Sequence, residues 1–466
     1  MHAPHLQKDL ISVHVWRQTQ TQSTIQNFYE EDMNILNPRR NDRGAGEGIF
    51  RMEFPLMQWG VALLYKALGN DIMVTRLAMF LISLFSMLGI WFLLFQAFGH
   101  EKLALMGAWA ITFSPTFFYY AINPMPDNLA LCCGIWGLGV FLSWTKKPAS
   151  WRLLISGLLL SLATLSKLPF VLYFAFPAGY FLYDWIQNRW RNEFVRYAFL
   201  LLIPLVFPAA WYIWVIPGWE GNGVVAGVFD NQIGWGTFFD YVQHNLISTL
   251  PELLLNYGSV PFFLAGFYFL GKRKAHSQLS FAAFALLGLA LAAYFFFEIN
   301  MIAKVHAYYL MPFFPLLFTL VGYGAWHLSE IRKPLSRYLV YGILLLLPLT
   351  CFLRTQARWQ YEKPGFNPDI LTYKTELQAA SPGDALCVVG NDASHYILFY
   401  HLNRKGWGFD HDQLTAAQLE SMINSGAEYL YSDSRTVDQN PDIQPYLDSL
   451  VLEKGSVRVF RLLGSH

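Results

Sequence analysis

Long runs of apolar residues without Asp, Glu, Lys or Arg dominate the pattern of this chain. Clear examples are residues 77–98, 197–219, 253–271 and 277–297. Each run is about as long as the ~20 residues that a helix needs to cross the ~30 Å hydrocarbon core of a bilayer. Hydrophobic residues make up 54% of the chain and charged residues only 14%. The pattern therefore predicts an all-α polytopic membrane protein.

Ten candidate spans follow one another along the middle of the chain. They are residues 75–98, 103–121, 127–145, 151–166, 168–185, 197–216, 252–271, 279–299, 306–326 and 338–353. The polar first segment of the chain carries several basic residues and would have to be moved across the membrane. We therefore also expect one further helix upstream of it, which would make eleven spans.

Basic residues are distributed unequally between the loops on the two sides of these spans. One set of loops contains Lys102, Lys146, Lys147, Arg152, Arg189, Arg191, Arg196, Lys272, Arg273, Lys274, Arg332, Lys333 and Arg337. The opposite set contains only Lys167 and Lys304. The positive-inside rule places the first set in the cytoplasm and both polar ends of the chain outside. We expect a multi-pass protein of a bacterial cytoplasmic (inner) membrane with its active site on the periplasmic or extracellular side.

This topology divides the chain into three parts. Residues 1–74 form a first extracytoplasmic loop with interfacial helices, residues 75–353 the transmembrane helical domain, and residues 354–466 a small soluble α/β domain. In the last part, strand-like runs at 385–389, 428–431 and 457–462 are separated by a helical pattern at 415–425 that ends at Gly426. Residues 57–68 read as an amphipathic helix along the membrane surface.

Composition narrows the possible functions only a little. The 33 Lys and Arg residues nearly balance the 32 Asp and Glu residues, and the net charge of +1 gives no basis for binding nucleic acid. The four cysteines have no spacing typical of a metal site or a disulfide framework.

The few charges at outward ends of spans are the first candidates for chemistry. Asp127 follows two prolines at the start of the third span, where it is either a helix cap or a catalytic acid. Lys167 lies in an outward turn, where it is either a snorkelling lysine or a ligand for a phosphate. Lys304 and His306 have the same placement beside another span. Glu53, which precedes the amphipathic stretch, is a candidate acid, base or metal ligand, or else a cap or ion-pair partner.

Two further segments have side chains suited to a sugar. The stretch that contains Arg17, Gln18 and Gln20 is dense in hydrogen-bonding groups. The loop 217–251 has no lysine or arginine, and its aromatic side chains either form an interfacial belt or stack on a sugar. The residues concerned in that loop are Trp219, Phe229, Trp235, Phe238, Phe239 and Tyr241, with Asp230 and Asp240.

Several of these motifs occur together in an order that is typical of a known enzyme family. The segments are 16–21 (WRQTQT), 27–30 (NFYE), 53–56 (EFPL), 63–66 (LLYK), 125–127 (MPD), 165–169 (LSKLP) and 306–312 (HAYYLMP). In order and predicted side they resemble the bacterial family 39 glycosyltransferases of the GT-C fold, related to protein O-mannosyltransferase and the lipid A aminoarabinose transferase. The resemblance spans most of the chain.

The resemblance implies an inverting transfer of a sugar from a polyprenyl phosphate carrier to a protein, lipid or glycan acceptor. It places Asp127 at an important acid, and Lys167 and Lys304 near the carrier phosphate. Arg17, Gln18, Gln20, His306 and Tyr309 are the other candidate substrate-binding residues. Some members of the family use a divalent metal, and His14, Glu53 and Asp127 are residues that would hold one here.

One departure from the family pattern matters for the mechanism. Close relatives have an aspartate where this chain has Gln20, and an amide cannot act as a base. We therefore expect Asp127 or Glu53 to be the catalytic carboxylate, with Asp32 as a third choice. Gln20 also leaves open a catalytically inactive relative that binds lipid-linked sugar or scaffolds glycan assembly. A lipid-sugar transporter is less expected, because the predicted spans show neither internal repeats nor acids and bases in their interiors.

Overall fold

The computed structural model describes residues 1–466 except 45, 189–191, 220–232, 273–277 and 465–466. The chain divides into two compact units. The first, which we call the helical unit, comprises Met1, Met52–Phe54 and Arg76–Gln356. The second, which we call the sheet unit, comprises His2–Arg51, Pro55–Thr75 and Ala357–His466. The division into 1–74, 75–353 and 354–466 stays a prediction.

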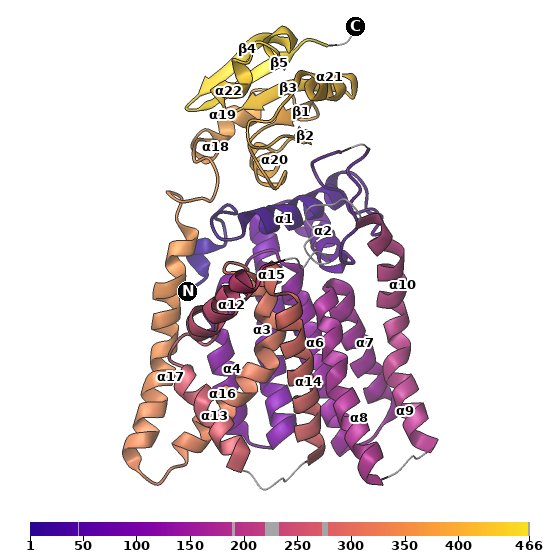
Figure 1. Ribbon diagram of the computed structural model, residues 1–466, viewed down its shortest axis with the longest axis vertical. Coiled ribbons are helices and arrows are strands. Elements are labelled where there is room, and N and C mark those ends of the chain that lie inside the picture. Colours follow the sequence, from indigo (N-terminus) through magenta and orange to yellow (C-terminus); the bar gives the residue numbers. More distant parts are fainter. Residues whose placement is uncertain (45, 189–191, 220–232, 273–277, 465–466) are drawn as a thin grey trace. The chain divides into compact units, whose positions relative to one another are not determined.

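Apolar helices that run side by side build the helical unit (Figure 1). Five helical stretches of the described residues are long and apolar enough to cross a membrane. They are Ile72–Phe98, Pro126–Lys146, Val195–Trp219, Ala307–Ser329 and Pro334–Trp359. Shorter apolar helices cover Ser150–Ser166, Val260–Lys272 and Phe281–Phe297. The prediction of a polytopic membrane protein is confirmed.

The helical unit contains the following elements. They are α3 (Ile72–Phe98), α4 (Glu101–Thr112), α5 (Pro115–Tyr120), α6 (Pro126–Lys146), α7 (Ser150–Ser166), η2 (Leu168–Phe174), α8 (Ala175–Asn188), α9 (Asn192–Leu202), η3 (Ile203–Leu205), α10 (Val206–Val215), η4 (Ile216–Trp219), α12 (Trp235–His244), η5 (Asn245–Leu254), α13 (Val260–Lys272), α14 (Gln278–Phe297), α15 (Ile299–Ile302), η6 (Ala307–Phe313), α16 (Phe314–Ser329) and α17 (Pro334–Thr355).

Proline divides several of the spans that the sequence predicts as continuous. The predicted span 103–121 is two helices, because Ser114 caps α5 with its side chain and Pro115 occupies the first position of that helix. Pro204 lies in the 3₁₀ turn η3 between α9 and α10. Such interruptions leave backbone carbonyl and amide groups free to bond with neighbouring side chains.

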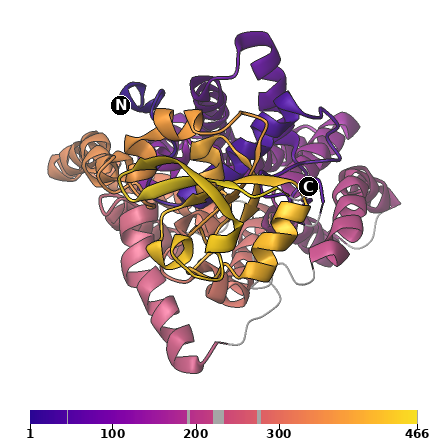
Figure 2. The same ribbon diagram turned by 90° about the horizontal axis from the view of Figure 1, so that it is seen from above.

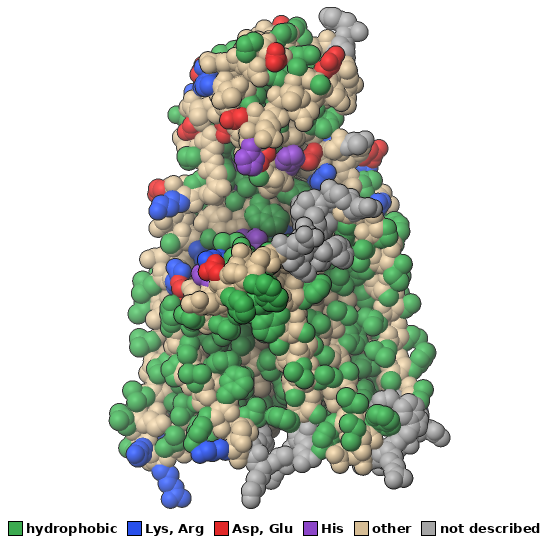
Figure 3. Space-filling model, in the orientation of Figure 1, with side chains coloured by type: hydrophobic (Ala, Val, Ile, Leu, Met, Phe, Trp, Pro, Cys, Tyr) green, Lys and Arg blue, Asp and Glu red, His purple; other side chains and the backbone are tan. Residues whose placement is uncertain are grey.

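Small residues let some of these helices approach closely. A Cβ atom on Gly266 of α13 would lie 2.2 Å from the Leu320 carbonyl oxygen of α16. A Cβ atom on Gly324 of α16 would likewise clash with the carbonyl oxygen of Phe262. Close backbone contact at small residues is a usual way for membrane helices to associate, since burial from lipid provides little driving force. Apolar side chains cover the visible sides of the bundle (Figure 3).

The sheet unit combines both ends of the chain. Its helices are η1 (Ala3–His5), α1 (Val15–Glu30), α2 (Leu56–Leu68), α18 (Asp369–Thr372), α19 (Lys374–Ala379), α20 (Ile397–Leu402), α21 (Ala416–Asn424), α22 (Arg435–Asp438) and η8 (Gln444–Tyr446), while η7 (Gln356–Trp359) starts at the boundary. Helix α2 confirms the helix predicted at 57–68, and its position at a membrane surface stays a prediction.

A twisted five-stranded sheet forms the core of the C-terminal part (Figure 2). The strands are β1 (Leu386–Val389), β2 (Lys405–Gly408), β3 (Ala427–Ser432), β4 (Leu447–Lys454) and β5 (Val457–Leu462), in the order β2-β1-β3-β5-β4. Strand β1 is parallel to β2 and β3, whereas β5 is antiparallel to β3 and β4. The predicted strands β1, β3 and β5 and the predicted helix α21 are confirmed.

The N-terminal segment is part of the same hydrophobic core. Val15 of α1 is buried in a cluster with Phe399 of α20 and Val459 of β5. The backbone amide of Arg43 donates to the Gly406 carbonyl over 2.7 Å, and the amide of Gly406 donates to the Asn41 carbonyl over 3.0 Å. The first 51 residues therefore fold together with the tail.

Candidate active site

Glu53 is held against two membrane helices by the residues on either side of it. The Phe54 amide donates to the Leu165 carbonyl over 3.0 Å. The indole of Trp211 donates to the Met52 carbonyl over 3.0 Å, and its ring packs edge-on to Phe54 with the ring centroids 4.9 Å apart. The Glu53 side chain is only 8% exposed. Backbone and aromatic contacts thus fix a carboxylate at the ends of α7 and α10.

Asp127 lies in the first turn of α6, directly after Pro126. Its side chain is buried, with 2% exposure. The capping position is Met125, so Asp127 is not the residue that caps the helix. The neighbouring Asn128 donates to the carbonyls of Tyr120 and Asn123 over 2.8 and 3.1 Å, which closes the turn before α6. Asp127 therefore occupies a rigid helix start whose dipole favours a negative charge.

Tyr212 of α10 connects the two carboxylates. Its hydroxyl donates to the carbonyls of Thr164 and Leu165 over 3.1 and 3.2 Å. It also interacts electrostatically with Glu53 and Asp127. The structure therefore brings together the two carboxylates that the sequence analysis selected as candidate bases.

Lys167 supplies a cation at the same end of the bundle. It is the residue at which α7 ends and the 3₁₀ helix η2 begins. Its ammonium group lies over the Tyr309 ring, 5.8 Å from the ring centroid. The Tyr294 hydroxyl donates to the Tyr309 carbonyl over 3.2 Å, which anchors Tyr309 to α14. Lys167 therefore has an aromatic partner for its ammonium group, and its role as a phosphate ligand stays a prediction.

Glu298 is a third carboxylate of this site, and the sequence analysis missed it. It interacts electrostatically with Lys167, and Tyr294 interacts with both Glu298 and Asp127. The predicted span 279–299 includes Glu298. Helix α14 ends at Phe297, so the predicted span is two residues too long at this end and Glu298 lies just beyond the helix. An acid inside a predicted span is the signal that would have revealed it.

Lys304 and His306 flank these residues but have local partners. The Lys304 ammonium forms an ion pair with Asp240 of α12 over 2.6 Å, and both side chains are substantially exposed. His306 Nδ1 lies 2.6 Å from the Met301 carbonyl oxygen, and burial lowers the pKa of this histidine. Its ring is 5.8 Å from that of Tyr309.

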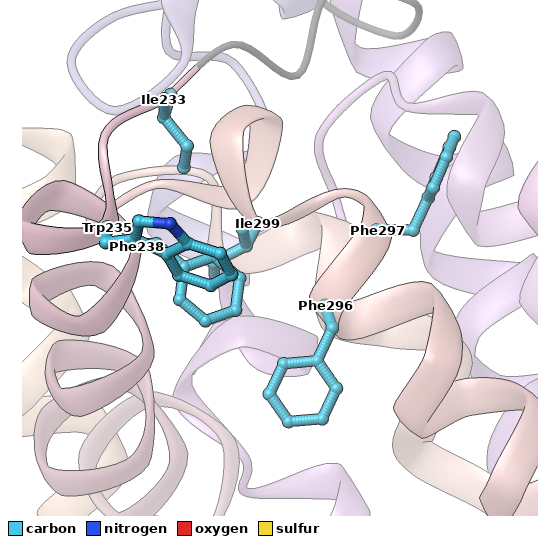
Figure 4. A pocket seen from close by; sticks show the side chains of 6 residues that line it. All are labelled: Ile233, Trp235, Phe238, Phe296, Phe297 and Ile299. Atoms are coloured by element: carbon cyan, nitrogen blue, oxygen red, sulfur yellow. The ribbon is translucent and has the colours of Figure 1, made fainter.

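An apolar pocket of about 300 Å³ lies beside this group (Figure 4). It is lined by Ile233, Trp235, Phe238, Phe296, Phe297 and Ile299. Figure 4 shows Trp235 and Phe238 of α12 close to Ile299, whereas Phe297 points away from them. Two of the lining residues adjoin Glu298 in sequence, so apolar and charged surfaces meet here. Of the loop residues named in the sequence analysis, Phe229 and Asp230 lie outside the described residues.

The described residues do not support a metal centre. Apart from the gaps in the description, no group of three or more His, Cys, Asp or Glu side chains is arranged to hold a metal ion. His14, Glu53 and Asp127 therefore form no such group among the residues that the structure describes.

Arg17, Gln18 and Gln20 lie on α1 of the sheet unit and are buried. Arg17 donates to Gln20, and Gln18 donates to the Val13 carbonyl over 2.8 Å. Gln20 also interacts electrostatically with Tyr396, beside α20 of the same unit.

Asp32, the third choice for a base, binds a local turn instead. Its side chain accepts a hydrogen bond from the Asn34 amide over 2.8 Å. That bond is the main reason that the pKa of Asp32 is lowered. Asp32 thus has a structural task in the sheet unit.

Comparison with known proteins identifies the fold. Residues 53–214 match the family model of the dolichyl-phosphate-mannose-protein mannosyltransferases. No curated protein matches the chain. The crystal structure of ArnT from Cupriavidus metallidurans in the apo state is similar with a TM-score of 0.67 and 14% identity, over 98% of this chain and 96% of that chain.

Two further solved structures are similar. ArnT from the same organism bound to undecaprenyl phosphate has a TM-score of 0.67 and 13% identity, over 98% of this chain and 95% of that chain. The apo oligosaccharyltransferase of Archaeoglobus fulgidus has a TM-score of 0.57 and 14% identity, over 91% of this chain and 66% of that chain. At such identities the likeness shows the fold. The chain is thus a polytopic membrane protein with the GT-C fold, and its residues 53–214 are similar to the dolichyl-phosphate-mannose-protein mannosyltransferase family.

Proposed function

We propose that this protein is an inverting glycosyltransferase that moves a sugar from a polyprenyl phosphate carrier to an acceptor on the outer face of the membrane. The observation that carries the proposal is the group formed by Asp127, Glu53 and Lys167 at one end of the helical unit. Two proteins of the same fold support the choice of donor. One structure is of ArnT bound to undecaprenyl phosphate, and the other is of AglB in complex with an inhibitory peptide and a dolichol-phosphate.

Each charged group has a distinct task in this reaction. Asp127 accepts the proton of the acceptor hydroxyl as the oxygen attacks the anomeric carbon. The bond between that carbon and the phosphate oxygen breaks on the opposite face, which inverts the configuration. Lys167 balances the charge that develops on the leaving phosphate. General base catalysis contributes roughly 10²–10⁴-fold to such reactions, and a positioned cation contributes further.

Asp127 is the better candidate for the base, and Glu53 orients the acceptor. Asp127 interacts with Tyr294 as well as Tyr212, and Tyr294 reaches the residues around Lys167. Glu53 is coupled to Tyr212, on the side of α10. We therefore assign the base to Asp127, which would approach the acceptor hydroxyl on the face of the anomeric carbon opposite the leaving phosphate.

The apolar pocket suits the lipid part of the donor. Its volume of about 300 Å³ and its aromatic lining fit the first isoprene units of the carrier. Because Glu298 lies between the lining residues Phe297 and Ile299, a tail in this pocket brings its phosphate toward Lys167.

An Asp127→Asn variant tests the proposal. The substitution keeps the shape of the side chain and removes its basicity, so sugar transfer should fall by roughly 10²-fold or more. The assay supplies purified protein with radiolabelled polyprenyl phosphate sugars and a cell-envelope extract, and measures label in product and release of carrier phosphate. Glu330→Gln is the matched control, since Glu330 pairs with Lys102 at the surface over 3.7 Å. Normal transfer by Asp127→Asn would exclude its role as the base.

The same assay separates the enzyme from an inactive relative, which Gln20 makes the second candidate. A protein that only binds the lipid-linked sugar would retain labelled carrier but release no carrier phosphate. The choice between hexosyl and pentosyl donors, and between protein, lipid and glycan acceptors, follows from which labelled donor yields product.

A further inference from the structure

Glu298 is buried next to the cation of the site, but its carboxylate is incompletely bonded. The residue is 8% exposed, and its Oε2 atom has no hydrogen-bond partner among the residues that the structure describes. Burial raises the pKa of Glu298 to about 7, although Lys167 attracts its charged form. A buried carboxylate is costly unless it is paired and hydrogen-bonded. This residue is therefore poorly explained by a role in folding alone.

Two acidic side chains lie near Lys167. Glu298 and Asp127 both interact with Tyr294, whose hydroxyl donates to the Tyr309 carbonyl. The Lys167 ammonium lies over the ring of Tyr309. A phosphate that binds Lys167 thus enters a site that already holds acidic side chains. Charge repulsion within a partly buried site is much stronger than in water.

The proposed reaction changes the charge of the phosphate. In the donor, the phosphate is a diester and carries one negative charge. When the acceptor oxygen displaces it from the anomeric carbon, the carrier keeps the bonding electron pair and becomes a phosphate monoester. A monoester carries about −1.5 to −2 charge near pH 7, and the proton lost by the acceptor passes to the base. The product is thus more anionic than the donor at the same position.

We propose that Glu298 promotes release of the carrier phosphate after transfer by repelling the monoester more strongly than the diester. Glu298 is then a positioning and specificity-determining residue that acts through Lys167, which attracts both phosphates. The inference rests on the proposed function, because it assigns the second anion to a lipid carrier. In this role Glu298 speeds product release and does not act as a second base.

A matched pair of lipids tests this role without knowledge of the sugar or the acceptor. Undecaprenyl phosphate is the monoester, and its methyl ester is the corresponding diester. Binding of both to the purified full-length protein in detergent is measured for the wild type and for Glu298→Gln at pH 8, where Glu298 is mostly ionised. We expect the variant to bind the monoester roughly tenfold more tightly than the wild type does, with a smaller gain for the diester.

Three controls separate charge from structure. Glu298→Asp keeps the charge and should bind both lipids as the wild type does. Glu252→Gln removes the acid of another pair, formed with Arg354, and should change neither affinity. In a Lys167→Met background, Glu298→Gln should no longer favour the monoester, because the cation that brings the phosphate close has been removed.

The outcomes distinguish the inference from the function on which it rests. If the wild type binds neither lipid, both the proposed function and the inference are wrong. If the wild type binds them but Glu298→Gln leaves the preference unchanged or weakens monoester binding, only the role of Glu298 is overturned. A folded Glu298→Gln variant with a shifted preference, together with a wild-type-like Glu298→Asp variant, supports it.

Discussion

Glu31 and Glu298 are two glutamates with opposite surroundings. Glu31 of the sheet unit accepts hydrogen bonds from Arg43 and Lys405, each over 2.5 Å. Burial alone would raise the pKa of Glu31, but these two cations lower it to about 2. Glu298 of the helical unit has an oxygen without a hydrogen-bond partner among the described residues and one attracting lysine.

The comparison separates charges that hold the fold from charges available for chemistry. In the sheet unit, acids and bases form closed networks, such as Asp438 with Arg435 and Arg458 over 3.0 and 3.1 Å. In the helical unit, Glu53, Asp127 and Glu298 are buried, and the Oε2 atom of Glu298 has no hydrogen-bond partner among the described residues. Buried ionisable side chains are costly in a membrane protein, which makes this group a candidate for binding a charged ligand.

The largest expected effect distinguishes Lys167, which attracts Glu298, from Lys405, which forms an ion pair with Glu31. Lys167→Met should reduce kcat/KM for sugar transfer by roughly 10²-fold or more, since it removes the cation that stabilises the leaving phosphate. Lys405→Met removes a cation from Glu31 and should leave transfer within about twofold of the wild type. The radiolabelled assay measures both. Equal losses of transfer would show that the two units do not differ in the way proposed.

The sequence predicted the membrane class and much of the sheet unit for clear physical reasons. Apolar runs of span length and strands such as 457–462 have strong local signals. Helix α21 was predicted from its pattern and from Gly426, and the structure adds a capping box between Thr415 and Gln418. Strand β4 was missed because it lacks the alternation of buried and exposed residues that marks a strand. Five of its eight residues are exposed.

The candidate site was only partly predictable. Asp127 and Lys167 were selected because each is an isolated charge at the outward end of a span, and Glu53 because it precedes an amphipathic stretch. Glu298 was missed because the end of α14 at Phe297 is not marked in the apolar run. The association of residues 1–51 with the tail was also missed, since it depends on contacts between residues more than 350 positions apart, such as His395 with Asp42. Sequence periodicity contains no information about such pairings.

The next largest effect concerns how the stability of the sheet unit depends on pH. His401 of α20 is fully buried, and burial lowers its pKa from 6.5 to about 3. The unfolded chain therefore binds a proton that the folded chain does not, and stability falls as the pH drops from about 6.5 towards 3, by about 1.4 kcal/mol per pH unit. His401→Gln should flatten this slope. Hydrogen exchange of sheet-unit amides between pH 5 and 7 measures it.

His395 provides an internal contrast for that measurement. Its hydrogen bond with Asp42, over 3.2 Å, raises the pKa of His395. This pair is therefore fully formed below about pH 6.5 and is lost as the pH rises through the raised pKa. His395→Gln should reduce stability on the acidic side and leave it unchanged at higher pH. A slope of the same sign for both histidines would contradict these assignments.

A smaller effect is expected at Glu31 itself. Glu31→Gln removes a carboxylate whose side chain is 18% exposed, so solvent screening limits the loss to about 1 kcal/mol. The contribution is present above pH 4.5 and is lost as the pH falls toward 2, since the folded-state pKa is the lower one. Hydrogen exchange at pH 7 and at the lowest pH that the protein tolerates should show a difference between variant and wild type only at pH 7.

The smallest effect is expected at the exposed pair of the helical unit. Asp240→Asn frees Lys304, but both side chains are well solvated, so carrier binding should change less than about threefold. The matched measurement is the affinity for undecaprenyl phosphate, in which Glu298→Gln is expected to act more strongly. If Asp240→Asn tightened binding as much as Glu298→Gln, the phosphate would lie nearer Lys304 than Lys167. In that case the burial of Glu298 would not explain its effect on phosphate binding, because an exposed acid beside a lysine would have the same effect.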